Sequence, residues 1–173
     1  DADGDPVLLV DPEPSAVELL VAEQVVARIP DGATLQLGIG GLPVAVCRAL
    51  KYHRRLGVHS GVVSDAVIDL IEQGAVDHSC KGADAGKLVT GGLFGSNRLN
   101  CHADGNPAVE MRSVEYTHNP VVMAGVRNLY AINSAIEVDL SGQVNAEVAG
   151  TRYIGAVGGQ SDFVRGAQAS PGG

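Results

Sequence analysis

Three short apolar runs in this chain each end in a glycine-bearing turn, and this pattern constrains the fold most. The turns are Gly38-Ile39-Gly40-Gly41 after Ala33–Leu37, Gly91-Gly92 after Lys87–Thr90, and Gly158-Gly159 after Ile154–Val157. Glycine lets the backbone approach a ligand closely and adopt positive φ, so such turns present bare N–H groups. We therefore predict an α/β fold that binds a ligand at the ends of its strands.

Helical segments separate these runs, as an α/β fold requires. Ser15-Ala16-Val17-Glu18 has the pattern of a capping box, in which each outer side chain accepts from the other residue's backbone N–H. Apolar residues at helical spacing follow it. The predicted helices run from this box to about Ile29, from Ala66 to Gln73 behind a Ser64-Asp65 cap, and from Phe163 to Ala169 behind a Ser161-Asp162 cap.

The segment between Leu129 and Val148 differs from the rest of the chain. It consists of short apolar runs parted by Ser141-Gly142, a pattern that resembles a hairpin more than a crossover connection. We therefore expect an α/β fold with an open, mixed sheet and flanking helices.

Size and charge restrict the class of protein. A chain of 173 residues with 45% hydrophobic residues fits one domain with a sizeable core. The net charge of −8 argues against nucleic-acid binding, which needs a basic face. No apolar run approaches the ~18 residues of a membrane span, and no charged-then-apolar leader opens the chain. We expect a soluble, cytoplasmic protein that binds no nucleic acid and no membrane.

Residues 1–14 differ in composition from residues 15–173. They open with Asp1-Ala2-Asp3-Gly4-Asp5-Pro6, which is acidic and turn-rich, so residues 1–14 are predicted to be a flexible lead or linker. Residues 15–173 are predicted to form one domain. The cysteines lack CxxC spacing, which favours reduced thiols over a disulfide framework or a zinc site; they are Cys47, Cys80 and Cys101.

Two familiar catalytic or cofactor patterns are present only in part. Gly38-x-Gly40-Gly41 lacks the third glycine of a dinucleotide fingerprint and an acidic residue at the distance that a ribose needs, which disfavours a Rossmann site. His59 and Ser60 are adjacent, and adjacent side chains on a strand point to opposite faces. They do not form a Ser–His pair by themselves.

Other polar residues allow two interpretations each. Glu137 and Asp139 lie two apart on a predicted strand, so they share a face and form either a carboxylate pair or contacts to an edge or a turn. Asn133 is an uncharged polar residue in an apolar strand. It either satisfies a neighbouring backbone group or orients a reacting one.

A series of segments in a fixed order carries more information than any of them alone. The segments are Leu37-Gly38-Ile39-Gly40, Leu56-Gly57-Val58-His59-Ser60, Ser64-Asp65, Asn106-Pro107-Ala108-Val109-Glu110-Met111-Arg112, Ala131-Ile132-Asn133-Ser134-Ala135-Ile136-Glu137-Val138-Asp139, Gly142-Gln143-Val144 and Gly158-Gly159-Gln160-Ser161-Asp162-Phe163. Together they resemble the acetyl-CoA hydrolase/transferase family, which includes acetate and 4-hydroxybutyrate CoA-transferases. The match runs from about Val17 to Gly166 and resembles the first part of the family's C-terminal half. We therefore expect the N-terminal half, and the final strands after Gln160–Arg165, to be lacking.

The resemblance implies an open CoA-transferase fold with CoA between two halves. In such enzymes a glutamate after the His-Thr/Ser pair attacks the acyl thioester and forms an anhydride and then a glutamyl-CoA thioester. Here that position is Gly61, and Val62-Val63-Ser64-Asp65 continues the family pattern. The resemblance therefore implies that this chain lacks the family's nucleophile.

The resemblance also assigns roles to residues around that position. It matches Asn133 to the asparagine that orients the reacting carboxyl, and Gly159 to the loop whose amide serves the thioester oxyanion, a role that needs no side chain. The CoA-binding surface that it implies consists of Gly38, Ile39, Gly40, Gly41, Gly158, Gly159 and Gln160.

Three functions stay open on this sequence. The first, which we favour, is acyl-CoA hydrolysis, or other acyl-CoA chemistry, without a glutamyl-CoA intermediate. The second is a catalytically silent CoA-binding subunit or the partner of an active chain, and the third is a CoA-transferase with a substitute nucleophile. In each, acyl-CoA is a substrate or ligand rather than a tightly bound cofactor. A carboxylate acceptor, the N-terminal half or a partner chain, and a second copy in a homo-oligomer are the expected partners.

Overall fold

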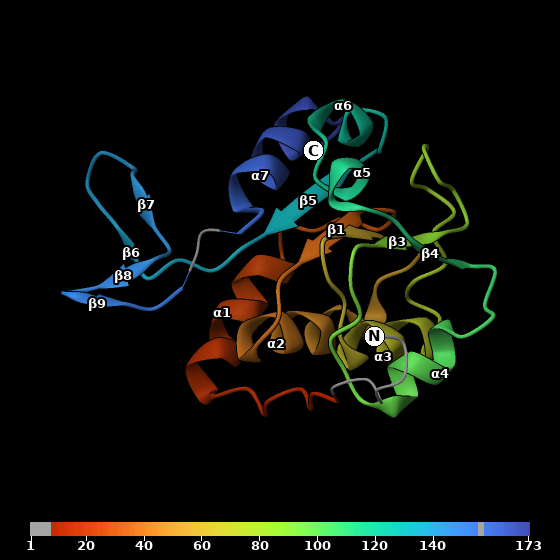
Figure 1. Cartoon of the computed structure of the whole chain (residues 1–173), viewed down its shortest axis with the longest axis horizontal. Helices are drawn as coiled ribbons and strands as arrows, with labels where there is room; N and C mark the ends of the chain where they lie inside the picture. The colour runs from red at the N-terminus through yellow and green to blue at the C-terminus, as the bar shows by residue number, and fades with distance from the viewer. Residues whose placement is uncertain (1–7, 156–157) are drawn as a thin grey trace, which may run out of the picture.

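A parallel sheet forms the centre of the molecule (Figure 1). The structure is a computed structural model that describes residues 8–155 and 158–173. Within these residues the sheet has five strands in the order β4-β3-β2-β1-β5. They are β1 (Thr34–Leu37), β2 (Gly57–Ser60), β3 (Leu88–Thr90), β4 (Val109–Met111) and β5 (Leu129–Ile132).

The strands are parallel because helices and loops return the chain across the sheet between them. Thr34 pairs with Gly57 of β2 on one side and with Leu129 of β5 on the other. Every residue of β1, β2 and β3 is buried. Burial on both faces is the usual state of parallel strands, since helices cover each face. Each strand therefore delivers its last residue to one common edge of the sheet.

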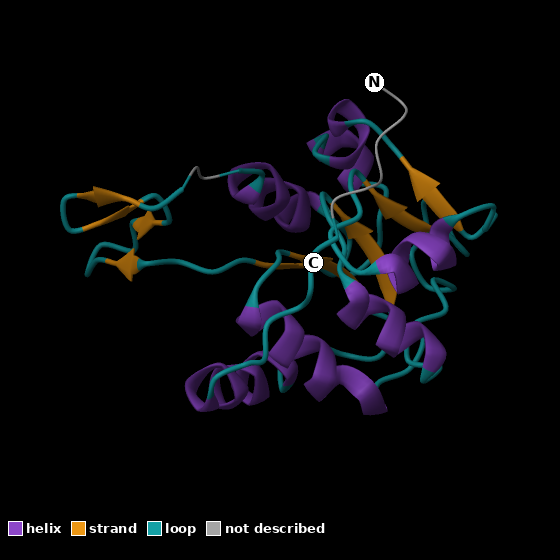
Figure 2. Ribbon diagram, turned by 60° about the horizontal axis from the view of Figure 1, so that its bottom comes forward, coloured by secondary structure: helices purple, strands orange, loops and turns teal. Residues whose placement is uncertain are grey.

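Two groups of helices cover the two faces of the sheet (Figures 1 and 2). One group packs side by side on one face, and the other lies on the opposite face near β5. The first group is α1 (Ala16–Val26), α2 (Gly41–Ala49), the 3-10 helix η1 (Leu50–Tyr52), α3 (Asp65–Glu72) and α4 (Asn97–Ala103). The second group is α5 (Val114–Thr117), α6 (Pro120–Met123) and α7 (Gln160–Ala169).

The hydrophobic core is divided by the sheet. The larger cluster lies between the strands and the first group of helices and includes Leu35, Val46 and Ile68. A smaller cluster on the other face is formed by Met123, Val126, Leu129 and Phe163. The smaller cluster fixes α7 to β5 and α6, so it sets where the first residues of α7 lie.

The segment between β5 and α7 projects from the body as an arm (Figure 1). In the described residues it holds two antiparallel ribbons: β6 (Glu137–Val138) with β7 (Val144–Asn145), and β8 (Val148–Ala149) with β9 (Arg152–Tyr153). The predicted α/β class with an open sheet and flanking helices is confirmed. The antiparallel pairing that the hairpin-like runs predict occurs in these two ribbons. The strand pairs of the five-stranded sheet are parallel. Residues 156 and 157 of the predicted run Ile154–Val157 lie outside the described residues.

The helix caps agree with the sequence in one case and differ in two. The capping box of Ser15 and Glu18 is present. Ser64 is the N-cap of α3, but the backbone N–H of Ala66 is satisfied by the Asp11 carboxylate at 2.9 Å instead.

The predicted Ser161-Asp162 cap of the last helix is wrong. The helix begins at Gln160 with Gly159 as N-cap, because the Gly159 carbonyl already accepts from the N–H groups of Asp162 and Phe163. This earlier start places Gly159 directly at the N-terminus of α7.

The start of the chain packs against the first helix group where it is described. Leu9 donates its N–H to Gly95 at 2.9 Å, and Glu13 forms an ion pair with Arg48 at 2.6 Å. Residues 1–7 of the predicted lead lie outside the described residues. Across the described part of the chain, no helix is long and apolar enough to cross a membrane.

Candidate active site

A pocket of about 210 Å³ opens at the edge where the central strands end. Gly38 follows β1, Gly61 follows β2 and Asn133 follows β5, and all three line the pocket. In an open α/β sheet this carboxyl edge is the usual place for a ligand. The full lining is Gln36, Leu37, Gly38, Gly61, Val62, His118, Asn133, Gly159, Gln160 and Phe163.

The structure brings together many of the residues that the sequence singles out, but not all of them. Gly38, Gly61, Asn133, Gly159 and Gln160 meet in the pocket. The other four lie apart from its lining: Ile39 and Gly40 line a separate hollow beside Leu9 and Phe94, Gly41 opens α2 against the Glu18 carboxylate, and Gly158 precedes the N-cap of α7.

Asn133 is held by a second amide side chain. Its Nδ2 donates to Oε1 of Gln36 at 3.0 Å, and Nε2 of Gln36 lies 3.4 Å from Oδ1 of Asn133. Gln36 is buried on β1, which pairs directly with β5. The Asn133 amide therefore bonds to a side chain rather than to a neighbouring backbone group. This contact fixes the Asn133 amide at the pocket and leaves it one further N–H.

Gly61 and Gly159 face the same imidazole ring. A methyl group at residue 61 would lie 2.8 Å from Cε1 and 3.0 Å from Nε2 of His118, and a methyl group at residue 159 would overlap the ring. Real side-chain atoms do not approach so closely. The ring of His118 therefore fills the space that a side chain at either glycine would need.

His118 is held on two sides. Its Nδ1 lies 2.9 Å from Oγ1 of Thr117, and its ring packs against the ring of Phe163 with a centroid separation of 4.6 Å. Phe163 is buried in the smaller core cluster, so the contact links the imidazole to α7. The position of the His118 ring is thus set by two different helices.

His59 holds the backbone of Thr117, the residue before His118. The side chain is fully buried, and its Nε2 lies 3.0 Å from the carbonyl oxygen of Thr117. Burial, with the nearby Lys81 charge, lowers the pKa of His59 to about 4, so the ring is neutral at pH 7 and donates from Nε2. Its Nδ1 has no hydrogen-bond partner among the described residues.

Ser60 takes no part in a pair with His59. Its Oγ donates to the carbonyl oxygen of Leu37 at 2.9 Å, on β1. The prediction that His59 and Ser60 do not form a Ser–His pair is therefore confirmed. Both side chains are buried and donate to backbone carbonyl groups, His59 to Thr117 and Ser60 to Leu37.

The two carboxylates of the arm are occupied by local contacts. The hydroxyl and the backbone N–H of Ser141 donate to Oδ1 of Asp139 at 2.7 and 2.8 Å, and these bonds hold the pKa of Asp139 below its ordinary value. The Glu137 carboxylate accepts from Nδ2 of Asn145 at 3.0 Å. Of the two interpretations of this pair, the structure supports turn binding.

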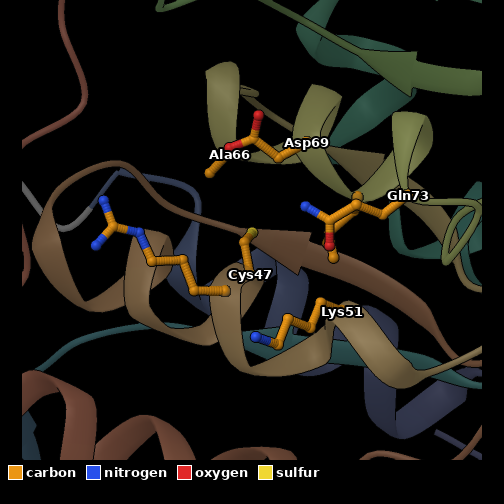
Figure 3. Close-up of a pocket in the computed structure, with 7 residues that line it drawn as sticks. Cys47, Lys51, Ala66, Asp69 and Gln73 are labelled. Atoms are coloured by element: carbon orange, nitrogen blue, oxygen red, sulfur yellow. The ribbon is translucent and has the colours of Figure 1, made fainter.

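A second hollow, of about 270 Å³, lies between α2 and α3. Figure 3 shows Cys47 of α2 and Lys51 of η1 on one side, and Ala66 and Asp69 of α3 with Gln73 at its C-terminal end on the other. Burial raises the pKa of the Cys47 thiol to about 12, which keeps the thiol protonated and unreactive. Asp69 is paired with Arg98 at 2.6 Å. This hollow therefore offers packing rather than chemistry.

The sequence missed three residues of the pocket. Gln36 has the same pattern as Asn133, a polar residue in an apolar strand, and this is the signal that indicates it. No sequence motif includes His118, and Phe163 lies within a predicted helix, so nothing in the local pattern indicates that they meet Gly61. In the described part of the chain, no group of three or more metal-ligating side chains gathers at any place.

Comparison with known proteins supports the resemblance. The model of the acetyl-CoA hydrolase/transferase C-terminal domain matches residues 95–173. The 4-hydroxybutyrate coenzyme A transferase of Clostridium kluyveri is 44% identical over 94% of this chain and 38% of its own length. The chain belongs to the acetyl-CoA hydrolase/transferase family. An acetyl-CoA hydrolase of Kluyveromyces lactis is 30% identical over 83% of this chain and 27% of its own length.

Solved structures of similar proteins share the fold. The 4-hydroxybutyrate CoA-transferase of Porphyromonas gingivalis superposes with a TM-score of 0.86 and 37% identity over 98% of this chain and 40% of its own. RipA from Yersinia pestis gives a TM-score of 0.85 and 35% identity, over 98% of this chain and 38% of its own. The chain thus spans about two fifths of the length of these relatives, and the expected CoA-transferase-like fold is confirmed.

Proposed function

We propose that the protein hydrolyses acyl-CoA thioesters in the pocket at the carboxyl edge of the sheet, without a glutamyl-CoA intermediate. The observation that supports this most is that Gly61, Asn133 and Gly159 meet in one pocket with an imidazole ring beside them. The family handles acyl-CoA, and here the matched nucleophile position carries no side chain. With no carboxylate at that position to attack the thioester, water is the acyl acceptor that we propose.

The pocket offers groups suited to the negative charge of a thioester transition state. The first N–H groups of an α-helix have no acceptor within the helix, and they carry a partial positive charge. The α7 helix begins at this pocket with Gly159 and Gln160. We propose that these N–H groups and the Asn133 amide stabilise the oxyanion, which is the type of contribution that preorganised donors make.

The carboxylates of the chain do not favour a substitute nucleophile. The described residues that line the pocket include no aspartate or glutamate. Glu137 and Asp139 are engaged by Asn145 and Ser141 in the projecting arm. The second candidate is therefore a silent CoA-binding subunit, which is favoured by the loss of a side chain at Gly61.

The relatives are longer than the part that this chain matches, and their additional length raises the question of what covers the site. We propose that the CoA moiety is enclosed by an N-terminal half or a partner chain, and that the protein forms a homo-oligomer in the cytoplasm. An apolar hollow of about 410 Å³ between α1 and the edge strand β5 supports such cover, since Val21, Val25 and Ile132 line it. Exposed apolar surface beside an unpaired strand edge is a common docking surface.

Thiol release from acyl-CoA tests the proposal. The full-length native protein should release CoA from acetyl-, butyryl- or succinyl-CoA in the absence of any carboxylate acceptor, and added acetate should not increase the rate. Release that requires an acceptor would show transfer instead. Binding of acyl-CoA in calorimetry without any release would identify the silent subunit.

A further inference from the structure

We propose that His118 is the general base of this site, on the basis that the proposed acyl-CoA hydrolysis is correct. In this role Nε2 of His118 takes a proton from the attacking water molecule. The inference depends on where the ring lies, on which nitrogen carries the proton, and on what holds the ring in place.

The position of the ring is the first argument. The edge of the imidazole that carries Cε1 and Nε2 is the part nearest to Gly61, within 3.0 Å of a methyl group built there. Nε2, together with Cδ2 on its other side, also faces Gly159 just before the start of α7. A histidine thus presents its reactive edge to the position where the family resemblance implies a glutamate, next to the proposed oxyanion donors.

The tautomer of the ring is the second argument. Thr117 Oγ1 donates to the carbonyl oxygen of Ser113 at 3.3 Å, so its hydroxyl proton is engaged. The 2.9 Å contact between Thr117 Oγ1 and Nδ1 of His118 is then satisfied by a proton on Nδ1, which donates to the hydroxyl oxygen. In the neutral ring the other nitrogen, Nε2, is left with a free lone pair. This tautomer is assigned from the hydrogen bonds, and it is the one that a base facing the pocket needs.

The support of the ring is the third argument. Thr117 is fully buried, and its carbonyl oxygen accepts from His59 at 3.0 Å. Phe163 of α7 packs against the His118 ring, with the two ring planes tilted by 53°. A base, a group that orients the base and a rigid support together form the arrangement that identifies an activated site.

The reaction balances with water as the only co-reactant. Nε2 accepts a proton from water as the water oxygen forms a bond to the thioester carbon, and the carbonyl electrons move onto the oxyanion. When the oxyanion collapses, the C–S bond breaks and the sulfur leaves as a thiolate. The imidazolium returns its proton to this sulfur, so acyl-CoA and water give a carboxylic acid and free CoA, and His118 is regenerated.

The test compares histidine variants of the full-length native protein. His118→Ala should lower kcat for acyl-CoA hydrolysis by about 100-fold or more, since general base catalysis contributes typically 10²–10⁴-fold, with KM within about threefold of the original. Imidazole added to the solution should restore part of the rate, because removal of the ring leaves a space of its own shape beside Gly61. His102→Ala is the matched control, since His102 lies on α4 and contacts Asn106; it should keep full activity.

The outcomes separate this inference from the proposed function. If the original protein hydrolyses acyl-CoA and His118→Ala does so at a similar kcat, or changes only KM, His118 is not the base while the proposed function stands. If the original protein binds acyl-CoA and releases no thiol, the proposed function fails and the role of His118 fails with it. His118→Gln, which keeps a polar side chain of similar length, replaces His118→Ala under the same criteria if the alanine protein does not fold.

Discussion

A methyl group at residue 61 would lie 2.8 Å from Cε1 of His118, so a side chain at position 61 and this imidazole ring compete for one space. The glycine and the histidine are therefore coupled. The loss of a side chain at one position makes room for the ring at the other. This relationship is the basis for the first prediction.

Gly61→Glu alone should abolish hydrolysis without producing transfer, because the new side chain must displace the His118 ring. The double variant, Gly61→Glu with His118→Gly, should have room for the new Glu side chain beside Asn133. It should gain CoA transfer from butyryl-CoA to acetate, through the covalent route that splits the reaction into two steps. Product CoA esters are quantified by chromatography. Hydrolysis at the original rate in the single variant would disprove the competition for space.

Thr117 is predicted to act as a positioning residue for His118. Thr117→Val keeps the shape but removes the hydroxyl, so Nδ1 of His118 loses its 2.9 Å partner and kcat should fall about tenfold at unchanged KM. Thr117→Ser retains the hydroxyl and should recover most of the rate. Steady-state kinetics of the two variants measure this, and equal losses in both would indicate a packing role only.

The Asn133–Gln36 pair is predicted to contribute separately to stability and to activity. Asn133→Ala leaves the buried Gln36 amide without its 3.0 Å donor, which should cost about 1–3 kcal/mol of unfolding free energy and lower kcat. Adding Gln36→Leu removes the orphaned group, so stability should recover while activity does not. Denaturant unfolding followed by circular dichroism gives the stabilities. Recovery of activity in the double variant would contradict a direct role of Asn133.

The stability of this domain should fall with acidification below pH 6.5. Burial lowers the pKa of His59 and of His78 to about 4 each, from an ordinary value of 6.5. Between these values the unfolded chain binds more protons than the folded one, so stability is present above pH 6.5 and is lost as pH falls toward 4. Denaturant midpoints at pH 7 and pH 5 measure the effect. His59→Gln should flatten this pH dependence, and an unchanged slope would contradict it.

The sequence predicted the fold well because its signals are local. Buried parallel strands are short apolar runs, and the glycine turn after β1 and the box at Ser15 and Glu18 are each confined to a few neighbouring residues. The start of α7 at Gln160 was missed because a glycine N-cap leaves no side-chain signal.

The site could be predicted only in part for a physical reason. Gly61, Asn133 and Gly159 each follow or precede a regular element, so the carboxyl edge of the sheet gathers them. His118 stands at the end of α5, and two strand–helix–strand crossovers separate it from Gly61 along the chain. Its contact with Gly61 depends on how α5 and α7 pack. No spacing along the chain encodes such a contact.

The central claim is that water attacks the thioester directly, and a single turnover in ¹⁸O-labelled water tests it most directly. Full-length protein in excess over acyl-CoA should release a carboxylic acid that carries one ¹⁸O atom in that first turnover. Borohydride trapping with mass spectrometry should find no CoA adduct on the protein. An unlabelled acid in the first turnover, or CoA bound covalently to any carboxylate of the chain, would contradict the account and identify the nucleophile in its place.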